Sequence, residues 1–261
     1  MPPSESRKLS TLARGVEILE YIKDNSGAKT SDIITELNMP KSTVHSYLST
    51  LRELGLISRN EHGYTLGLRL LNFGMESRRK NDLFKLAGPK VKDIAYTVDE
   101  ACNFLIEEDG QMITIYTNTD MNNDPFFRLG LSYDMHVTAG GKAVLARLSD
   151  EKIGSILRKK GLPERTENTI TTRTELFEEI ERIRQQGFAV SDGELAEGFQ
   201  SVGAAVAFPG EELFGAFAVG GPKYRIGSPN IPNRIPELLM KKSSELEQEL
   251  KQYKASTEEE V

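Results

Sequence analysis

The polar side chains between positions 41 and 52 are of types that can hydrogen-bond to nucleic acid. Small hydroxyl residues are interspersed there with single lysine, histidine, tyrosine and arginine residues, and the first acidic residue is Glu53. Small donors can approach base edges and phosphates closely, whereas carboxylates would be repelled by the phosphates. The alternative is an ordinary solvent-facing helix, although such faces usually mix glutamate with lysine. The candidate DNA-contacting residues of this segment are Lys41, Ser42, Thr43, His45, Ser46, Tyr47 and Arg52.

Apolar spacing predicts the helix that would carry these side chains. Four apolar residues recur every three or four positions, so they form one stripe that faces a core. Pro40 is well tolerated in a first helical turn, and Gly55 is a natural C-cap. The polar candidates then lie on the opposite, outward side of the helix. The stripe consists of Val44, Leu48, Leu51 and Leu54.

Two further helices are expected before this one. Residues 11–23 show helical apolar spacing, and Asn25-Ser26-Gly27 is a break after them. A second, short helix is expected over 30–37, with Thr30 or Ser31 as its N-cap. Residues 38–40 then form the turn that leads into the third helix, because a proline disfavours helical structure at the residue before it.

A small hairpin is expected after the third helix. Residues 56–59 and 64–66 favour short strands, and residues 60–63 favour a tight turn between them. Two helices, a turn, a third helix and a hairpin form the winged helix-turn-helix pattern, in which the third helix enters the major groove. On the hairpin, Arg59 and His62 are expected near the DNA backbone.

The rest of the chain has the signals of an α+β domain with an antiparallel sheet, reached through a helix over 68–80. Asp109-Gly110 predicts a tight turn between strands at 101–108 and 111–117. Thr172 and Glu175 form a capping box that begins a helix over 173–186. Further strands are expected at 125–131, 188–191, 201–208 and 213–220, with a turn at Pro209-Gly210, and further helices at 140–148, 150–159 and 237–253.

Composition points to a globular protein of the cytoplasm. Charged residues make up 28% and apolar residues 38% of the 261 residues, which is enough for a substantial core. The sequence has no run near the roughly 18 apolar residues of a membrane helix and no signal-peptide pattern at its start. A single cysteine fits a reducing compartment. We therefore expect a cytoplasmic protein with no membrane partner.

The net charge of −6 is distributed unevenly along the chain. Residues 1–80 hold 12 basic against nine acidic residues, a net charge of +3, and residues 81–261 carry −9. A basic first segment on an acidic body suggests that only this segment meets a polyanion such as double-stranded DNA.

Two stretches of the sequence carry a family resemblance. Residues 138–146 read TAGGKAVLA, and residues 42–51 read STVHSYLSTL. With the expected winged helix, they resemble the IclR family of bacterial and archaeal transcription regulators over about residues 12–253. The resemblance implies homodimers, which often pair further into tetramers. It also implies a winged helix-turn-helix domain at 10–67, a linker helix at 68–82, and a GAF-like effector-binding and oligomerisation domain at 83–255. From the sequence itself, we expect a disordered N-terminus at 1–9 and an acidic tail at 256–261.

The resemblance also implies a small-molecule site at the turn Thr138–Gly141. In the family, backbone amides of this turn hold a small organic ligand, commonly a carboxylate. The residues agree, because a helix N-terminus leaves N–H groups unpaired and two glycines allow close approach. This chain departs from the family pattern at Ser191, Ser201, Ala218 and Gly220, where an acid, a cysteine and two hydroxyl side chains are common. The candidate effector-binding residues are Leu131, Thr138, Ala139, Gly140, Gly141, Ser191, Ser201, Ala218 and Gly220.

Several other chemistries are not supported by the sequence. Gly141-Lys142 does not continue a phosphate-binding loop, because His136 and Ala143 replace the glycine and the hydroxyl residue that this loop needs. The three histidines are too scattered for a metal site, and Cys102 is expected to be a buried, inert thiol. No nucleophile–base constellation stands out. We therefore expect no enzyme activity, no metal and no cofactor.

Three functional hypotheses remain open. The first is a ligand-responsive transcription regulator that binds a pseudo-palindromic operator as a dimer or tetramer. The second keeps DNA binding but makes the C-terminal domain a dimerisation module only, which the replaced hydroxyls at positions 218 and 220 favour. The third is an enzyme or small-molecule-binding protein whose winged helix contacts other proteins, and it predicts no sequence-selective DNA binding.

Overall fold

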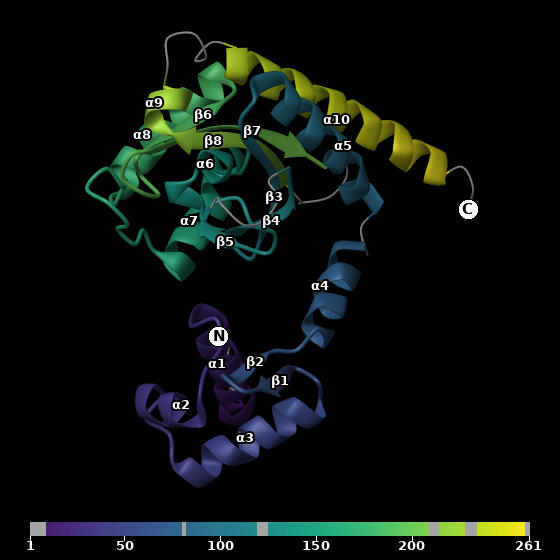
Figure 1. Ribbon diagram of the computed structural model, residues 1–261. Helices are drawn as coiled ribbons and strands as arrows, with labels where there is room; N and C mark the ends of the chain where they lie inside the picture. Colours follow the sequence, from purple (N-terminus) through teal and green to yellow (C-terminus); the bar gives the residue numbers. More distant parts are fainter. Residues whose placement is uncertain (1–8, 80–81, 119–124, 209–213, 228–233, 259–261) are drawn as a thin grey trace, which may run out of the picture. The chain divides into compact units, whose positions relative to one another are not determined.

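The computed structural model describes residues 9–79, 82–118, 125–208, 214–227 and 234–258. The chain divides into two compact units, Met1–Lys80 and Asn81–Val261, and each has a hydrophobic core of its own. Figure 1 shows the helices and strands of both units. Within the described ranges, no helix is both long enough and apolar enough to cross a membrane.

The first unit consists of three short helices closed by a two-stranded hairpin, followed by one more helix (Figure 1). The apolar stripes of the three helices meet in one core, because residues three or four apart share a helix face. The core residues are Ile18, Ile22, Ile33, Val44, Leu48, Leu51, Ile57 and Tyr64. The elements are α1 (Ser10–Asp24), α2 (Thr30–Glu36), α3 (Lys41–Glu53), the antiparallel strands β1 (Ile57–Asn60) and β2 (Gly63–Leu66), and α4 (Arg69–Arg79).

Two details of the first unit differ from the sequence expectation. The N-cap of α2 is Lys29 rather than Thr30 or Ser31, and the Asp32 carboxylate accepts the Lys29 backbone N–H at 3.1 Å. A carboxylate in the first turn can satisfy this donor without a hydroxyl cap. Leu54, expected in the buried stripe of α3, is 46% exposed, because it lies past the last helical residue beside an open groove.

The second unit is a six-stranded antiparallel sheet with helices on both faces (Figure 1). Its strand order is β5-β4-β3-β8-β7-β6. Helices α5 and α10 pack side by side on one face, and α6, α7 and α8 cover the other. The strands are β3 (Ala101–Glu108), β4 (Gln111–Thr117), β5 (Ser132–Asp134), β6 (Ala189–Asp192), β7 (Phe199–Ala207) and β8 (Phe214–Pro222). The helices are α5 (Asp82–Val98), the 3₁₀ turn η1 (Met135–Val137), α6 (Ala139–Leu145), α7 (Asp150–Lys160), α8 (Arg173–Gln186), α9 (Lys223–Ile226) and α10 (Arg234–Glu258).

Alternation along the central strands sorts side chains between the two layers, because successive strand residues point to opposite faces. On β3, Phe104 packs towards α5 and α10, and Leu105 packs towards α6. On β8, Phe217 joins the first layer, whereas Ala216 and Ala218 join the second. The small residues on the α6 side let that helix lie close to the sheet. The α+β prediction with an antiparallel sheet is confirmed.

One helix and one loop of the second unit differ from the expected elements. Helix α5 was not expected, because Gly88 and Pro89 interrupt its apolar spacing, although Val91 and Ile94 are fully buried. Residues 125–131, expected to be a strand, form turns instead, and the edge strand β5 begins only at residue 132. Gly130 has a φ of +78°, which does not fit an extended strand.

Expectations at several chain segments lie wholly or partly outside the described residues. These are the disorder expected at the start of the chain, which covers residues 1–8, the turn expected at Pro209-Gly210, and the end of the expected acidic tail at residues 259–261. The expected C-terminal helix is longer than the sequence pattern indicated, because α10 continues to Glu258.

Candidate nucleic-acid interface and ligand cavity

The outward face of α3 presents the polar side chains singled out in the sequence. Its buried side, made by Val44, Leu48 and Leu51, fixes the rotation of the helix and so sets which residues point away. The hydroxyl of Ser46 donates to the Ser42 carbonyl at 3.1 Å, which leaves its oxygen lone pairs for an outside donor. Exposed on this face are Lys41, Ser42, His45, Ser46, Ser49 and Arg52, while Thr43 and Tyr47 are half-buried.

The hairpin after α3 carries the two other candidate DNA contacts. The guanidinium of Arg59 lies 5.6 Å from the centre of the Tyr64 ring, so a cation–π contact holds it at the surface. The backbone N–H of His62 donates to the Asn60 side chain at 2.9 Å, which stabilises the turn. The exposed Glu61 carboxylate lies 3.7 Å from His62 Nε2. The turn therefore exposes a histidine and a carboxylate side by side. Only the histidine was among the predicted DNA contacts.

An apolar groove of about 870 Å³ lies between α1 and α3. Ile18 and Ile22 fill the core, whereas Leu12 and Val16, on the other side of α1, are 69% and 46% exposed and line the groove with Leu54. The periodicity of α1 predicted the helix, but it did not show which of its two apolar stripes is covered. A contiguous exposed apolar patch of this kind usually marks an interaction surface.

In the second unit, the turn before α6 is tightly packed. The Thr138 hydroxyl accepts the Gly141 N–H at 3.1 Å, so one of the amide groups expected to be unpaired is capped by the chain itself. Gly203 on β7 lies under this turn, where an added Cβ would come within 2.6 Å of the Gly140 nitrogen. The absence of a side chain at position 203 therefore lets α6 begin directly against the sheet.

A small cavity of about 30 Å³ lies between this turn and the sheet. It brings together five of the nine predicted effector-binding residues: Thr138, Ala139, Gly140, Ser201 and Ala218. Aromatic and aliphatic side chains complete the wall, and none of the lining residues carries a formal charge. The other lining residues are Asn103, Leu105, Phe126, Phe127, Tyr133, Leu195 and Phe199.

The other four predicted effector residues lie outside the cavity wall. The Ser191 hydroxyl is buried and donates to the Val137 carbonyl at 2.9 Å, so it holds the segment before α6 in place. Gly220 is packed beneath aromatic rings, because an added Cβ would lie 2.9 Å from the Phe199 ring. The Leu131 carbonyl accepts the Thr114 N–H, and Gly141 faces the backbone of η1.

Asn103 is the lining residue that the sequence pattern could have identified and did not. It follows the buried Cys102 and precedes the buried Phe104, so alternation places it on the α6 face of the strand, together with the apolar Leu105. An amide at an inward position among apolar residues was the available signal. The Oδ1 atom of Asn103 has no hydrogen-bond partner among the described residues.

Lys142 of α6 is buried in an ion cluster rather than exposed to a ligand. Its Nζ lies 2.6 Å from Glu194 and 3.1 Å from Glu179, and its side chain is 1% exposed. Burial raises the pKa of the Glu194 carboxyl above its ordinary value, although the nearby Lys142 opposes this shift. The cluster joins α6, α8 and the segment after β6, so it fixes the position of the turn that the cavity uses.

His136 and Cys102 are both buried, as was expected for Cys102. Residue His136 is buried, its Nε2 lies 3.1 Å from the Pro163 carbonyl, and burial lowers the pKa of the imidazole. Cys102 is fully buried in β3, and burial raises the pKa of its thiol far above the ordinary value. A thiol of this kind is unreactive while the sheet is closed.

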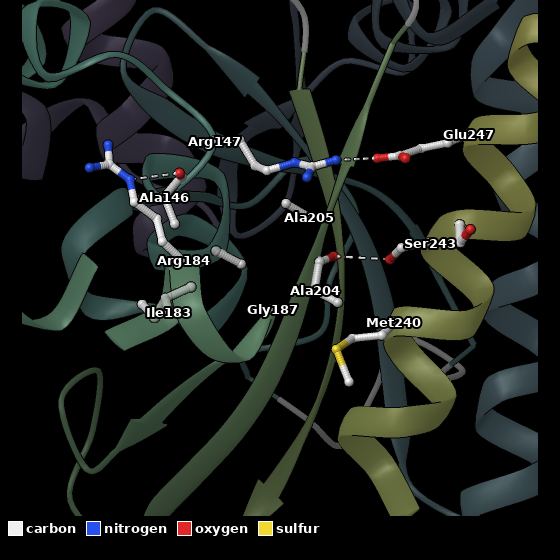
Figure 2. Close-up of a pocket in the computed structure, with 12 residues that line it drawn as sticks. Ala146, Arg147, Ile183, Arg184, Gly187, Ala204, Ala205, Met240, Ser243 and Glu247 are labelled. Carbon is white, nitrogen blue, oxygen red and sulfur yellow. Dashed lines mark hydrogen bonds and ion pairs between the residues drawn. The ribbon is translucent and has the colours of Figure 1, made fainter. Parts of the chain in front are cut away.

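A second cavity, of about 360 Å³, lies near the C-terminal end of α6 (Figure 2). Alanine residues of α6 and β7 form its floor, and Met240 of α10 closes one side. Its charged groups are paired within the protein: Arg147 contacts Glu247 at 2.7 Å, and Arg184 donates to the Ala146 carbonyl at 3.1 Å. Both arginines that line this cavity therefore already have partners within the protein. In the smaller cavity, by contrast, the side-chain oxygen of Asn103 has none among the described residues.

Comparison with known proteins assigns both units to one family. A family profile described as the bacterial transcriptional regulator IclR C-terminal domain matches residues 75–247, and the IclR helix-turn-helix domain profile matches residues 11–61. The probable HTH-type transcriptional regulator ArcR of Halobacterium salinarum is 26% identical over 248 residues, which cover 93% of this chain and 94% of that protein.

Solved structures show the same fold. The IclR structure of Thermotoga maritima is similar with a TM-score of 0.74 at 26% identity, over 93% of this chain and 99% of that one. An IclR homologue of Microbacterium hydrocarbonoxydans, complexed with 4-hydroxybenzoate, is similar with a TM-score of 0.75 at 20% identity, over 92% and 99% of the two chains. These matches extend across both units rather than one alone.

Proposed function

The chain belongs to the IclR family of DNA-binding transcription regulators, and on this premise we propose that it binds a pseudo-palindromic operator under the control of a small organic effector. Members of this family are regulators and not enzymes, as the sequence predicted. The proposal places α3 in the major groove, with the β1–β2 hairpin near the DNA backbone. The protein would act in the cytoplasm, where its DNA target lies.

The composition of the exposed face of α3 is the observation that carries the proposal. Six exposed polar or basic side chains follow one another along this face, and the acid of the helix is confined to its last residue, Glu53. Lys41 lies at the end of the helix that enters the groove and is suited to a phosphate contact. Serine and histidine side chains behind it can reach base edges.

A dimer with two such faces is the expected binding form. The apolar groove between α1 and α3, with Leu12, Val16 and Leu54 at its surface, would be covered by a second copy of the chain. Two-fold symmetry of the protein is matched by a pseudo-palindromic site whose half-sites are about one helical turn apart. Dimers can pair further into tetramers, which analytical ultracentrifugation with and without operator DNA would distinguish.

The effector is proposed to bind at the cavity between α6 and the sheet. Support comes from the convergence of Thr138, Gly140 and Ser201 on one cavity with aromatic walls. A small organic acid would place its carboxylate against the backbone N–H groups of the turn Thr138–Gly140. The Microbacterium homologue with bound 4-hydroxybenzoate supports an acid of this size. Effector binding would favour one of two dimer arrangements and so change the affinity for DNA.

One observation favours the narrower function of a DNA-binding protein whose second unit only dimerises. The cavity, at about 30 Å³, is close to the volume of one water molecule, and Ala218 and Gly220 offer no hydroxyl to a ligand. An effector would therefore have to enlarge this space. The two functions differ in whether any small molecule changes DNA binding.

The experiment that tests the proposal is DNA binding as a function of salt. Full-length protein would be titrated with the DNA upstream of its own gene and with a scrambled duplex of equal length, each at several salt concentrations. We expect tighter binding to the natural duplex and a steep decrease in affinity as salt rises, because phosphate contacts release counterions. Equal affinity for both duplexes would contradict the proposal. A repeat with small organic acids would separate an effector domain from a dimerisation module.

A further inference from the structure

Asn103 is a buried amide with an unpaired acceptor inside the proposed effector site. It is 4% exposed and lies opposite Ala218 in the register of β3 and β8. Its Oδ1 atom has no hydrogen-bond partner among the described residues. A buried polar atom without a partner costs free energy, so native structures usually complete it with water or a ligand. Because Asn103 lines the cavity, the cavity is the place from which such a partner would come.

The walls around Asn103 are suited to an aromatic ring. The rings of Phe126 and Phe199 pack with their centres 4.7 Å apart and their planes tilted by 48°, and the centre of the Phe127 ring lies 6.1 Å from that of Phe199. No lining residue is formally charged, so hydrogen bonds and ring packing are the interactions that these side chains can supply. A ligand that complements these side chains is mainly aromatic and carries a polar group that hydrogen-bonds to Asn103.

The Phe126 ring occupies the space that a ligand ring would need. A cavity of about 150 Å³ accommodates benzene, about five times the volume present here. Phe126 is half-buried, and its backbone carbonyl accepts the Tyr133 hydroxyl at 2.7 Å. Rotation of the Phe126 side chain would therefore free the face of Phe199 without moving the anchored backbone, at the modest cost of changing a rotamer.

We propose that Asn103 selects the effector by binding a hydroxyl group carried on an aromatic ring, which takes the place of the Phe126 ring against Phe199. This inference rests on the proposed function, because it assumes that the cavity is the effector site. The Oδ1 atom of Asn103 is an acceptor, so its complement is a hydrogen-bond donor, and a hydroxyl group on a ring supplies one. The complement to Asn103 is thus a hydroxylated aromatic acid rather than a short keto acid.

The test compares two ligands that differ only in the hydroxyl. Isothermal titration of the full-length protein with 4-hydroxybenzoate and with benzoate would measure both affinities, for the native chain and for Asn103→Leu. We expect the native protein to bind the hydroxylated ligand about tenfold or more tightly, and the variant to bind both equally. Without ligand, Asn103→Leu should melt at the same or a higher temperature, because the substitution removes an unpaired buried group.

Thr114→Val is the matched control. The Thr114 hydroxyl is also buried and without a partner among the described residues, but it does not line the cavity. This variant should keep the preference for the hydroxylated ligand. A second variant, Phe126→Ala, should bind both ligands more tightly than the native chain does, because no ring then has to be displaced.

Three results would overturn the inference. The first is a hydroxyl preference that persists in Asn103→Leu, which would place the selecting group elsewhere. The second is a clear decrease in the melting temperature of ligand-free Asn103→Leu, which would show that the amide is paired within the fold or with a water alone. The third is binding of neither ligand by the native chain or by Phe126→Ala. Selective DNA binding by the same preparations would show that the proposed regulator function survives these failures.

Discussion

The two units of the chain use polar side chains in opposite ways. In the first unit, the polar residues of α3 are exposed and their role depends on a partner outside the protein. In the second, Lys142, Glu194 and Asn103 are buried, and their energetics depend on neighbours supplied by distant segments. The difference shows that a surface for recognition can be encoded in one helix, whereas a buried site needs several elements to be placed correctly.

The two kinds of polar residue should differ in how much stability is lost when they are replaced. An exposed polar residue can be removed with little change in stability, because water replaces its contacts. A buried polar residue that is paired cannot be removed in this way, because its partner is left unpaired in a medium of low dielectric constant. Substitutions of paired, buried polar residues in the second unit should therefore change folding, and substitutions of the exposed polar residues on α3 should change only DNA binding.

Removal of the buried lysine should have the largest effect. Lys142→Met leaves the buried Glu194 without its cation, whereas Glu179 keeps its ion pair with Arg182, and we expect a loss of about 3–5 kcal/mol in the free energy of unfolding. Chemical denaturation followed by circular dichroism would measure it. The control is Lys223→Met, which breaks an exposed ion pair with Asp192 and should cost less than about 1 kcal/mol. Similar losses of stability in both variants would contradict the prediction that the buried ion pair contributes more to folding than the exposed one.

A methyl group added beneath α6 should have the next largest effect. Gly203→Ala places a Cβ within 2.6 Å of the Gly140 nitrogen, so α6 must shift away from the sheet. We expect a loss of about 1–3 kcal/mol in the free energy of unfolding, the usual range for overpacking. The same substitution in α7, Gly154→Ala, meets no contact closer than 3.5 Å and should stabilise the helix slightly. A stable Gly203→Ala protein would show that α6 does not depend on this close approach.

Removal of the exposed lysine should change binding but not folding. Lys41→Ala should weaken binding to specific and scrambled DNA alike, by about 1 kcal/mol, and reduce the slope of log affinity against log salt by about 0.9. The melting temperature should not change, because Lys41 is exposed. Lys23→Ala, on the last turn of α1, is the control and should leave the slope unchanged. A loss confined to one base pair would instead assign Lys41 to base recognition.

The smallest expected effect is a dependence of stability on pH. Burial lowers the pKa of His136 in the folded state, so below pH 6.5 the unfolded chain takes up a proton that the folded protein resists. Stability therefore falls as the pH is lowered from 7 towards 5, by less than about 1.4 kcal/mol per pH unit for this one proton. In His136→Gln, whose amide can still donate to the Pro163 carbonyl, this part of the slope should disappear. An unchanged slope would assign the acid sensitivity to other groups.

The same contrast explains what could be predicted from the sequence. The stripe of Val44, Leu48 and Leu51, the hairpin turn at Asp109-Gly110 and the capping box of α8 all depend on residues close in the chain, and all are present. Both turn residues, Asp109 and Gly110, have positive φ values of 54° and 79°, as the tight turn requires. Local chemistry was sufficient for these elements.

Features that depend on distant segments were not predictable. Lys142 and Glu194 are 52 positions apart, and only the fold brings them to 2.6 Å. Residues 125–131 have the apolar composition of a strand, but Phe126 and Phe127 pack on Phe199 instead of joining the sheet. Of the candidate effector residues in the turn, Thr138 to Gly140 line the cavity and Gly141 does not. The inward position of Asn103 was open to sequence reasoning, but the missing partner of its Oδ1 atom appears only in the folded protein.

The burial of Cys102 provides a built-in reporter of sheet opening. It is the only cysteine in the sequence, and it is fully buried at the centre of the second unit. A thiol reagent can therefore label the native chain only when β3 is transiently uncovered, and the labelling rate measures how often this happens. The protein thus needs no cysteine replacement before such a measurement, and a ligand that closes around Asn103, the next residue, should slow the labelling.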